Sequence, residues 1–130
     1  MGLMAYSPLG RGFLAGAYHD LSELPETDQR RHHPRHEPGN MEHNVKLLGQ
    51  LEEMAQDKGV TPAQLALAWL LAQGRDVFPI PGIRTRAHLE ENLKAGDVAL
   101  TADDLAWIER IMPPGAAAGP RTRDMDRVNL

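Results

Sequence analysis

The sequence predicts an α/β fold in which helices cover a parallel sheet. Two short apolar runs, residues 2–6 and 77–80, have the composition of strands that are buried on both faces. Each run is followed by a turn containing proline and glycine, and segments with helical periodicity lie between and after the runs. This alternation of strand and helix is typical of parallel strands joined by helical crossovers.

Composition and charge narrow the class of protein. The 130 residues suit one domain or part of a larger one. The 14 Lys and Arg residues against 18 Asp and Glu residues give a net charge of −4, which argues against a general nucleic-acid-binding protein. The absence of cysteine excludes disulfides and thiolate metal sites. No apolar run reaches the length of a membrane span and no signal peptide pattern is present, so we expect a cytoplasmic protein without membrane partners.

The first predicted strand, residues 2–6, is apolar throughout. Such a strand needs neighbours in a parallel sheet, and no strand-like run precedes it, so we expect the chain to begin in the middle of a fold. The turn Ser7-Pro8-Leu9-Gly10-Arg11-Gly12 follows. It is not a P-loop, because no Gly-Lys-Ser/Thr sequence comes after its glycines.

Residues 18–39 are predicted to form a long loop, because they have many charges, little periodicity and several prolines and glycines. Within it, residues 30–36 concentrate arginine and histidine. A metal site built from these histidines is one alternative. However, Pro34 interrupts helical spacing and no acidic or cysteine ligand lies at a matching distance along the chain, so we expect no metal. A basic loop lying over an anionic cofactor is favoured.

Two helices are predicted after the loop. The first begins with Asn40 as its N-cap and runs to about Lys58, with Gly59 just beyond its end. Its apolar stripe consists of Val45, Leu48, Leu51, Met54 and Ala55. The second has Thr61 as N-cap, and Gln64 at the position that completes a capping box. Residues 65–72 are apolar nearly all round, which predicts burial on most sides.

The second predicted strand, residues 77–80, leads through Pro81-Gly82 into a helix that Thr85 caps. Glycine at this turn can adopt a positive φ and lets a ligand approach the backbone closely. Arginines and a histidine crowd the helix N-terminus, where free N–H groups and the helix dipole also favour an anion. The turn therefore suits a phosphate. The alternative is an ordinary strand-turn-helix connection with a solvated basic rim.

A last helix is predicted from Thr101, which has acidic residues in the turn after it. Pro113-Pro114-Gly115 ends this helix. Its expected inner face consists of Leu105, Ile108, Ile111 and Met112. Residues 113–130 are predicted to form an irregular C-terminal tail.

Three segments agree in order and spacing with one protein family. They are A-Y-S-P-L-G-R-G at residues 5–12, G-V-T-P-A-Q-L-A-L-A-W-L-L-A-Q-G at residues 59–74 and P-I-P-G-I-R-T-R-A-H-L-E-E-N-L at residues 79–93. With V-x-L-T-x-x-D-L at residues 98–105 and the P-P-G-A-A-A-G tail, they resemble the C-terminal part of bacterial aldo-keto reductases. The resemblance spans essentially the whole chain and is weakest in residues 18–39.

The resemblance implies a C-terminal fragment of a (β/α)8 TIM barrel. The fragment would contain the last two strand-helix units, the C-terminal helix and the tail, so that residues 1–130 form a partial aldo-keto reductase domain. Sites in this fold lie at the carboxyl ends of the strands. Both turns described above are predicted to lie at such ends.

The resemblance also implies NADP(H) as the cofactor. By position, Tyr6 would stack on the nicotinamide ring, and an aromatic face suits a flat heterocycle. The backbone of the first turn would flank the pyrophosphate, with the residues Ser7, Pro8, Leu9, Gly10 and Arg11.

The second turn would hold the adenosine 2′-phosphate through Gly82, Ile83 and Arg84, because guanidinium binds phosphate through paired hydrogen bonds. Glu91 and Asn92 would lie near the adenine. His88 stands where many relatives have an arginine. A histidine carries a full charge only when it is protonated, so the preference for NADPH over NADH is expected to depend on this position.

The family's catalytic tetrad of Asp, Tyr, Lys and His belongs to the first half of the barrel, and no segment here matches it. Tyr6 and Tyr18 are not in its motif, so no catalytic residue is predicted. The resemblance implies a parent enzyme that transfers hydride from NADPH to a small aldehyde or ketone. Unpaired strand edges predict self-association or pairing with a complementary barrel half. A non-catalytic nucleotide-binding or barrel-completing module is the alternative, and a histidine-loop metal binder ranks last.

Overall fold

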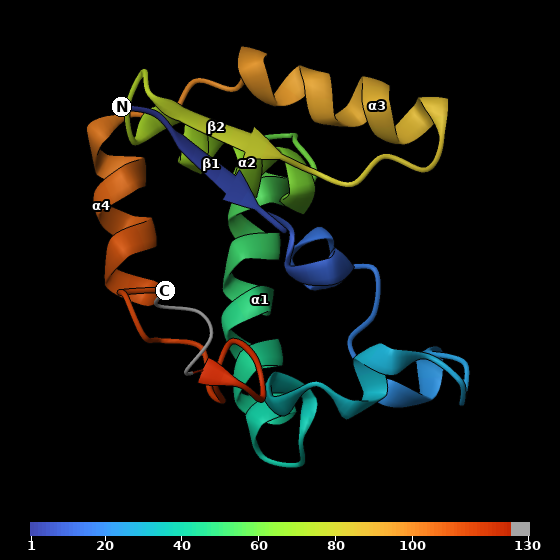
Figure 1. Ribbon diagram of the computed structural model, residues 1–130. Helices are drawn as coiled ribbons and strands as arrows, with labels where there is room; N and C mark the ends of the chain where they lie inside the picture. Colours follow the sequence, from blue (N-terminus) through green and yellow to red (C-terminus); the bar gives the residue numbers. More distant parts are fainter. Residues whose placement is uncertain (126–130) are drawn as a thin grey trace.

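The computed structural model describes residues 1–125 (Figure 1), so the predicted tail lies partly outside the described residues. The strands and α-helices are β1 (Leu3–Tyr6), α1 (Asn40–Asp57), α2 (Pro62–Ala72), β2 (Val77–Ile80), α3 (Arg86–Leu93) and α4 (Ala102–Ile111). The 3-10 helices are η1 (Gly10–Ala15), η2 (Leu21–Glu23), η3 (Gln29–His32), η4 (Pro34–His36) and η5 (Lys94–Asp97). The predicted α/β alternation is confirmed.

The two strands pair in parallel, with Leu3 opposite Val77 and Tyr6 opposite Ile80. The chain between them contains α1 and α2, which supply the crossover that parallel strands need. Parallel pairing puts the carboxyl ends of both strands at one edge of the sheet. The turns after β1 and β2 therefore lie side by side.

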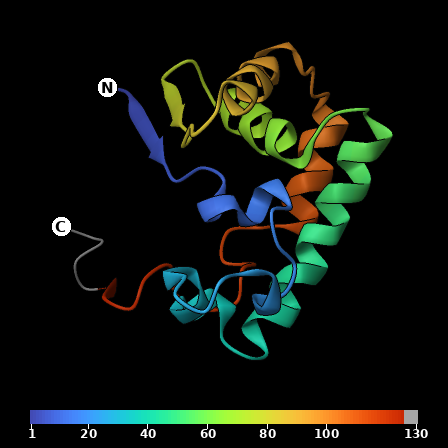
Figure 2. The same ribbon diagram turned by 90° about the vertical axis from the view of Figure 1, so that its right-hand side faces the viewer.

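The helices α1, α2 and α4 form a layer on one side of the strand pair (Figure 2). Their buried cluster joins Leu51 and Ala55 of α1 to Leu65 of α2 and Ile108 of α4. Residues 63–65, 67 and 68 of helix α2 are buried, but Leu71 is 43% exposed, so the predicted burial on most sides holds only for the first part of the helix. Within residues 1–125, no helix combines the length and the apolar character that a membrane span requires.

The strands differ from the prediction that they are buried on both faces. Leu3 and Met4 are 61% and 69% exposed, and Phe78 is 53% exposed. The prediction is wrong for the described residues. The helical layer packs against one face of the strand pair only, and on that face it does not cover Leu3. Met4 and Tyr6 of β1 lie opposite Phe78 and Ile80 of β2, and all four side chains are exposed.

The helix ends follow local sequence signals with one exception. Thr61, Thr85 and Thr101 are the N-caps of α2, α3 and α4, as predicted. The exception is α1, whose N-cap is Gly39 rather than Asn40. Asn40 is already helical, and its side-chain amide donates instead to the carbonyl oxygen of Pro34 at 2.9 Å.

Residues 18–39 contain no α-helix or strand, as predicted, but they build a small core of their own. Tyr18 is 1% exposed and packs with Leu24 and Met41. Its ring meets the His36 ring edge-on, with the centroids 5.4 Å apart. The turns η2, η3 and η4 therefore hold this segment in a defined shape against the start of α1.

The described part of the tail, residues 113–125, is irregular and packs along α1. Asn44, which is 4% exposed, accepts a hydrogen bond from the Ala118 backbone N–H at 2.8 Å and donates to the Ala118 carbonyl at 3.0 Å. Gly119 has a φ of +85°, and a Cβ there would lie 2.8 Å from the Pro34 carbonyl oxygen. Only glycine fits this contact, which fixes the tail beside η4.

Candidate functional site

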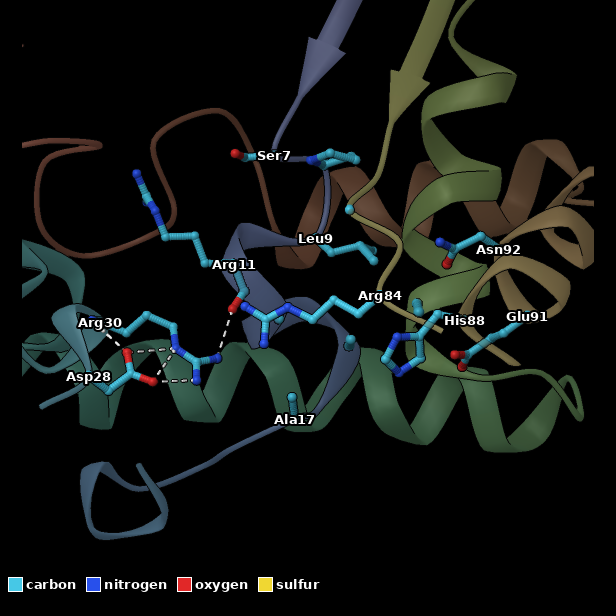
Figure 3. A pocket seen from close by; sticks show the side chains of 15 residues that line it. Ser7, Leu9, Arg11, Ala17, Asp28, Arg30, Arg84, His88, Glu91 and Asn92 are labelled. Carbon is cyan, nitrogen blue, oxygen red and sulfur yellow. Dashed lines mark hydrogen bonds and ion pairs between the residues drawn. The ribbon is translucent and has the colours of Figure 1, made fainter. Parts of the chain in front are cut away.

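A cavity of about 710 Å³ lies between the two turns, at the carboxyl ends of β1 and β2 (Figure 3). Its volume falls in the range of roughly 300–1,000 Å³ that ligand pockets have. Most of the predicted cofactor-binding residues line it, namely Ser7, Pro8, Leu9, Arg11, Gly82, Arg84, His88, Glu91 and Asn92. Two turns 70 residues apart in sequence are thus brought to one site by the strand pairing.

The turn after β1 has an unusual backbone. Ser7 and Arg11 have φ angles of 49° and 59°, in the left-handed region that non-glycine residues seldom adopt. Gly10 and Gly12 in the same turn also have positive φ. Strained backbone of this kind is concentrated at ligand sites.

The turn after β2 has open space beside Gly82 rather than a strained backbone. Gly82 does not have the positive φ that the sequence suggested, so that expectation is wrong. No atom lies within 4 Å of the position that a Cβ on Gly82 would take. Arg84 follows with an exposed side chain that reaches across the cavity (Figure 3). Within residues 1–125, Arg84 makes no hydrogen bond or ion pair, so its guanidinium is available to a ligand.

One face of α3 forms the far wall of the cavity. His88, Glu91 and Asn92 lie three and four residues apart, which puts them on the same side of the helix. The Thr85 hydroxyl accepts the His88 backbone N–H at 3.2 Å. The side-chain nitrogen of Asn92 is buried and has no hydrogen-bond partner in the described structure. An unsatisfied donor in a cavity wall favours a ligand that accepts from it.

Asp28 and Arg30 also line the cavity and were not predicted as site residues. They come from the loop that the sequence placed over an anionic cofactor. The Arg30 guanidinium binds the Asp28 carboxylate at 2.6 Å and donates to the Arg11 carbonyl at 3.2 Å. These hydrogen bonds from Arg30 lower the pKa of Asp28 to about 2, and the charge of Arg84 contributes. Arg30 therefore holds the loop against the first turn, and Arg84 faces the Asp28–Arg30 pair.

Three predicted residues lie elsewhere. Ile83 is 49% exposed and lines neither this cavity nor the one beside it. Tyr6 and Gly10 line a second cavity of about 440 Å³, which adjoins the first because Ser7 and Arg11 line both. The Arg121 guanidinium lies over the Tyr6 ring, 4.5 Å from its centroid.

The other tyrosine and the histidines offer no further site. Tyr18 is buried with its hydroxyl 3.3 Å from Nε2 of His36, and burial is the main reason that its pKa is raised. No group of three or more His, Asp or Glu side chains in residues 1–125 is placed to hold a metal ion.

The cavity between the turns is suited to a long anionic ligand. Arg84 and the N-terminus of α3 supply a positive end, and the strained first turn supplies backbone close to the ligand. Small apolar residues form the floor, with Ala15, Ala17 and Ala63 among them. The positive wall and apolar floor are the combination that nucleotide pockets use.

Comparison with known proteins gives a consistent picture. Residues 1–113 match the model of the aldo/keto reductase family. The chain is 42% identical over 126 residues to the Schizosaccharomyces pombe protein Aldo-keto reductase yakc, whose name includes NADP(+). It is 40% identical over 121 residues to the Glycine max protein named Probable aldo-keto reductase 1. These matches cover 89% and 93% of this chain but 37% and 35% of the relatives.

A solved structure agrees with the sequence relatives. The thermostable aldo-keto reductase Tm1743, determined with the inhibitor epalrestat, superposes with a TM-score of 0.58 at 30% identity. The match covers 86% of this chain and 30% of that chain. It confirms the predicted fold class, an α/β part of a (β/α)8 barrel. The chain spans about a third of the length of its relatives.

Proposed function

The chain belongs to the aldo/keto reductase family, and we propose that its residues form the cofactor-binding part of an NADPH-dependent reductase of aldehydes or ketones. In this proposal they correspond to the C-terminal part of the barrel. The NADP(+) in the name of the Schizosaccharomyces pombe relative supports the choice of cofactor. A cytoplasmic location and a bacterial source stay predictions from the sequence.

The observation that carries this proposal is the position of Arg84. Its guanidinium extends into a cavity lined by the first turn of α3, and it makes no hydrogen bond or ion pair within residues 1–125. A guanidinium binds a phosphate through paired, charge-assisted hydrogen bonds. We assign the adenosine 2′-phosphate to Arg84, with Gly82 leaving the space that this phosphate needs and His88 beside it. Ile83 contributes only its backbone, because its side chain faces solvent.

The remaining cofactor contacts follow from the cavity walls. Asn92 would donate its unsatisfied N–H to the adenine, next to Glu91. The first turn would line the pyrophosphate, with the residues Ser7, Pro8, Leu9, Gly10 and Arg11. Tyr6 would pack on the nicotinamide ring with the ring face that Arg121 leaves free.

When bound, NADPH supplies the hydride for carbonyl reduction. The chain's own residues bind and orient it, and none of them is assigned the role of proton donor. Tyr18 is buried against His36, and Tyr6 lies under Arg121, so neither is proposed as the acid. Reduction of a carbonyl would require the tetrad-bearing part of the barrel as well.

The proposal is tested by calorimetric titration of the protein with NADPH and with NADH. We expect Arg84→Ala to weaken NADPH binding by about 10- to 100-fold, the value of a lost charge-assisted contact, and to leave NADH binding unchanged. Arg86→Ala is the matched control, because Arg86 is bound to Glu90 and does not line the cavity. An equal loss in both variants, or no NADPH binding by the original chain, would refute the assignment.

A second candidate function is a non-catalytic module that binds nucleotide or completes a barrel with a partner. The exposed side chains of β1 and β2 favour it, since they form an apolar face that is open to another chain. A tetrad-bearing coding sequence directly upstream of this one would favour the reductase. Its absence, together with retained NADPH affinity, would favour this second candidate.

A further inference from the structure

The second cavity, beside Tyr6, has an unusual charge. It is lined by the side chains of three arginines, Arg11, Arg35 and Arg121, and by one carboxylate, Asp124. Four groups that sum to a net positive charge therefore share a space of about 440 Å³. Like charges held together in a partly closed site repel one another unless an anion joins them.

Each arginine is held in place by the fold. Arg11 donates to Nε2 of His33 at 2.7 Å, and Arg35 donates to the Gly119 carbonyl at 3.4 Å. Arg121 is positioned over the Tyr6 ring. Burial lowers the pKa of Arg35, and the charges of Arg121 and Arg11 lower it further. The cluster is thus built from the first turn, the 18–39 loop and the tail together.

The location of the cluster relates it to the proposed chemistry. Tyr6, the last residue of β1, lines the second cavity, and Ser7 and Arg11 line both. Because the two cavities adjoin at Ser7 and Arg11, a molecule in the second cavity lies beside the proposed cofactor site. That is where a carbonyl substrate has to be.

We propose that the second cavity binds the anionic end of the carbonyl substrate, so that the preferred substrates are aldehydes or ketones that carry a carboxylate. This inference rests on the proposed function, because it takes the position of the nicotinamide from it. Arginine is suited to the role, since its planar fork matches the two oxygens of a carboxylate. The cofactor pyrophosphate is the other anion that could reach this cavity, and the experiment separates the two.

The probes are 4-carboxybenzaldehyde and its neutral methyl ester, titrated into the full chain with and without saturating NADPH. We expect the carboxylate to bind at least about tenfold more tightly than the ester, both with and without NADPH. Arg121→Ala should lower the affinity for the carboxylate about tenfold and leave the affinity for the ester unchanged. Arg121→Lys should retain part of the affinity for the carboxylate. Arg75→Ala, which removes an exposed arginine that lines neither cavity, is the control.

Equal affinity for acid and ester, or no binding of either, overturns the inference. So does displacement of the carboxylate by NADPH, because the cluster would then belong to the cofactor. NADPH affinity and its dependence on Arg84 are measured on the same samples. If NADPH binds as proposed and the carboxylate is not preferred, only this inference is wrong. If NADPH does not bind, the proposed function is wrong and the inference falls with it.

Discussion

The helical layer and the two-stranded sheet bury their apolar side chains to very different extents. Leu65 in α2 is 1% exposed, whereas Leu3 in β1 is 61% exposed. The helices are packed on one another, and α2 and α4 have capped N-termini, so their stability is supplied within the described chain. The strands contribute mainly their geometry, which aligns the two turns of the site. The part of the fold that places the ligand is therefore distinct from the part that holds the protein together.

The largest expected effect comes from matched leucine substitutions in the two regions. Leu65→Ala should lower the free energy of unfolding by about 2–5 kcal/mol, because it leaves a cavity in the core. Leu3→Ala should change it by about 0.5 kcal/mol or less, as an exposed site does. Urea unfolding at equal protein concentration measures both. Equal losses would show that the sheet is as tightly packed as the helices.

A second prediction concerns the exposed face of the sheet. Phe78→Lys should weaken self-association by about 10- to 100-fold, since burial of an aromatic side chain contributes about 1.5–3 kcal/mol and a buried charge opposes contact. Sedimentation velocity over a range of concentrations gives the oligomer distribution. Lys46→Ala, on the exposed side of α1, is the control. A wild-type protein that stays monomeric at all concentrations would contradict self-association through this face.

The third prediction tests the source of the helical layer's stability. Thr61→Ala removes the capping-box contact to the Gln64 backbone N–H, which is 3.2 Å long, and should destabilise the protein by about 1 kcal/mol. Thr61→Ser keeps the hydroxyl and should restore most of the loss. Thermal or urea unfolding of the three proteins gives the comparison. If Thr61→Ser does not restore the stability, the loss in Thr61→Ala comes from the missing methyl group rather than from the cap.

The smallest effect is a pH dependence near the site. Burial lowers the pKa of His33 below its usual value of about 6.5, with the charges of Arg11 and His36 contributing next. Since the unfolded chain then takes up the proton first, stability is fully present above about pH 6.5 and falls as the pH drops below it. Unfolding in urea at pH 7.5 and 5.5 should show this loss of stability, and His33→Gln should make the difference between the two pH values smaller. An unchanged difference in the variant would mean that other groups cause the pH dependence.

Asp28 contributes in a separate pH range. Its pKa is lowered to about 2 from 3.8, so its contribution to stability is present above pH 3.8 and is lost as the pH falls toward 2.

Several features could be predicted from neighbouring residues alone. The caps Thr61, Thr85 and Thr101 and the strand Val77–Ile80 appear where the sequence placed them, because a cap or turn depends on residues within a few positions. Asn40 shows the limit of such reasoning. It is a good N-cap residue, but the nearby Pro34 carbonyl engages its side chain, and Gly39 takes the cap position.

The sequence by itself determined the α/β class, the N-caps of α2, α3 and α4 and most residues of the cavity between the turns, because each depends on local patterns or on motifs that resemble one family. Tertiary structure alone decided that Asp28 and Arg30 join that cavity, that Asn44 holds the tail, and that Arg121 lies over Tyr6. These contacts join residues far apart in the chain. Their formation depends on how the loop and the tail fold back onto the helices, and no local pattern in the sequence specifies these long-range contacts.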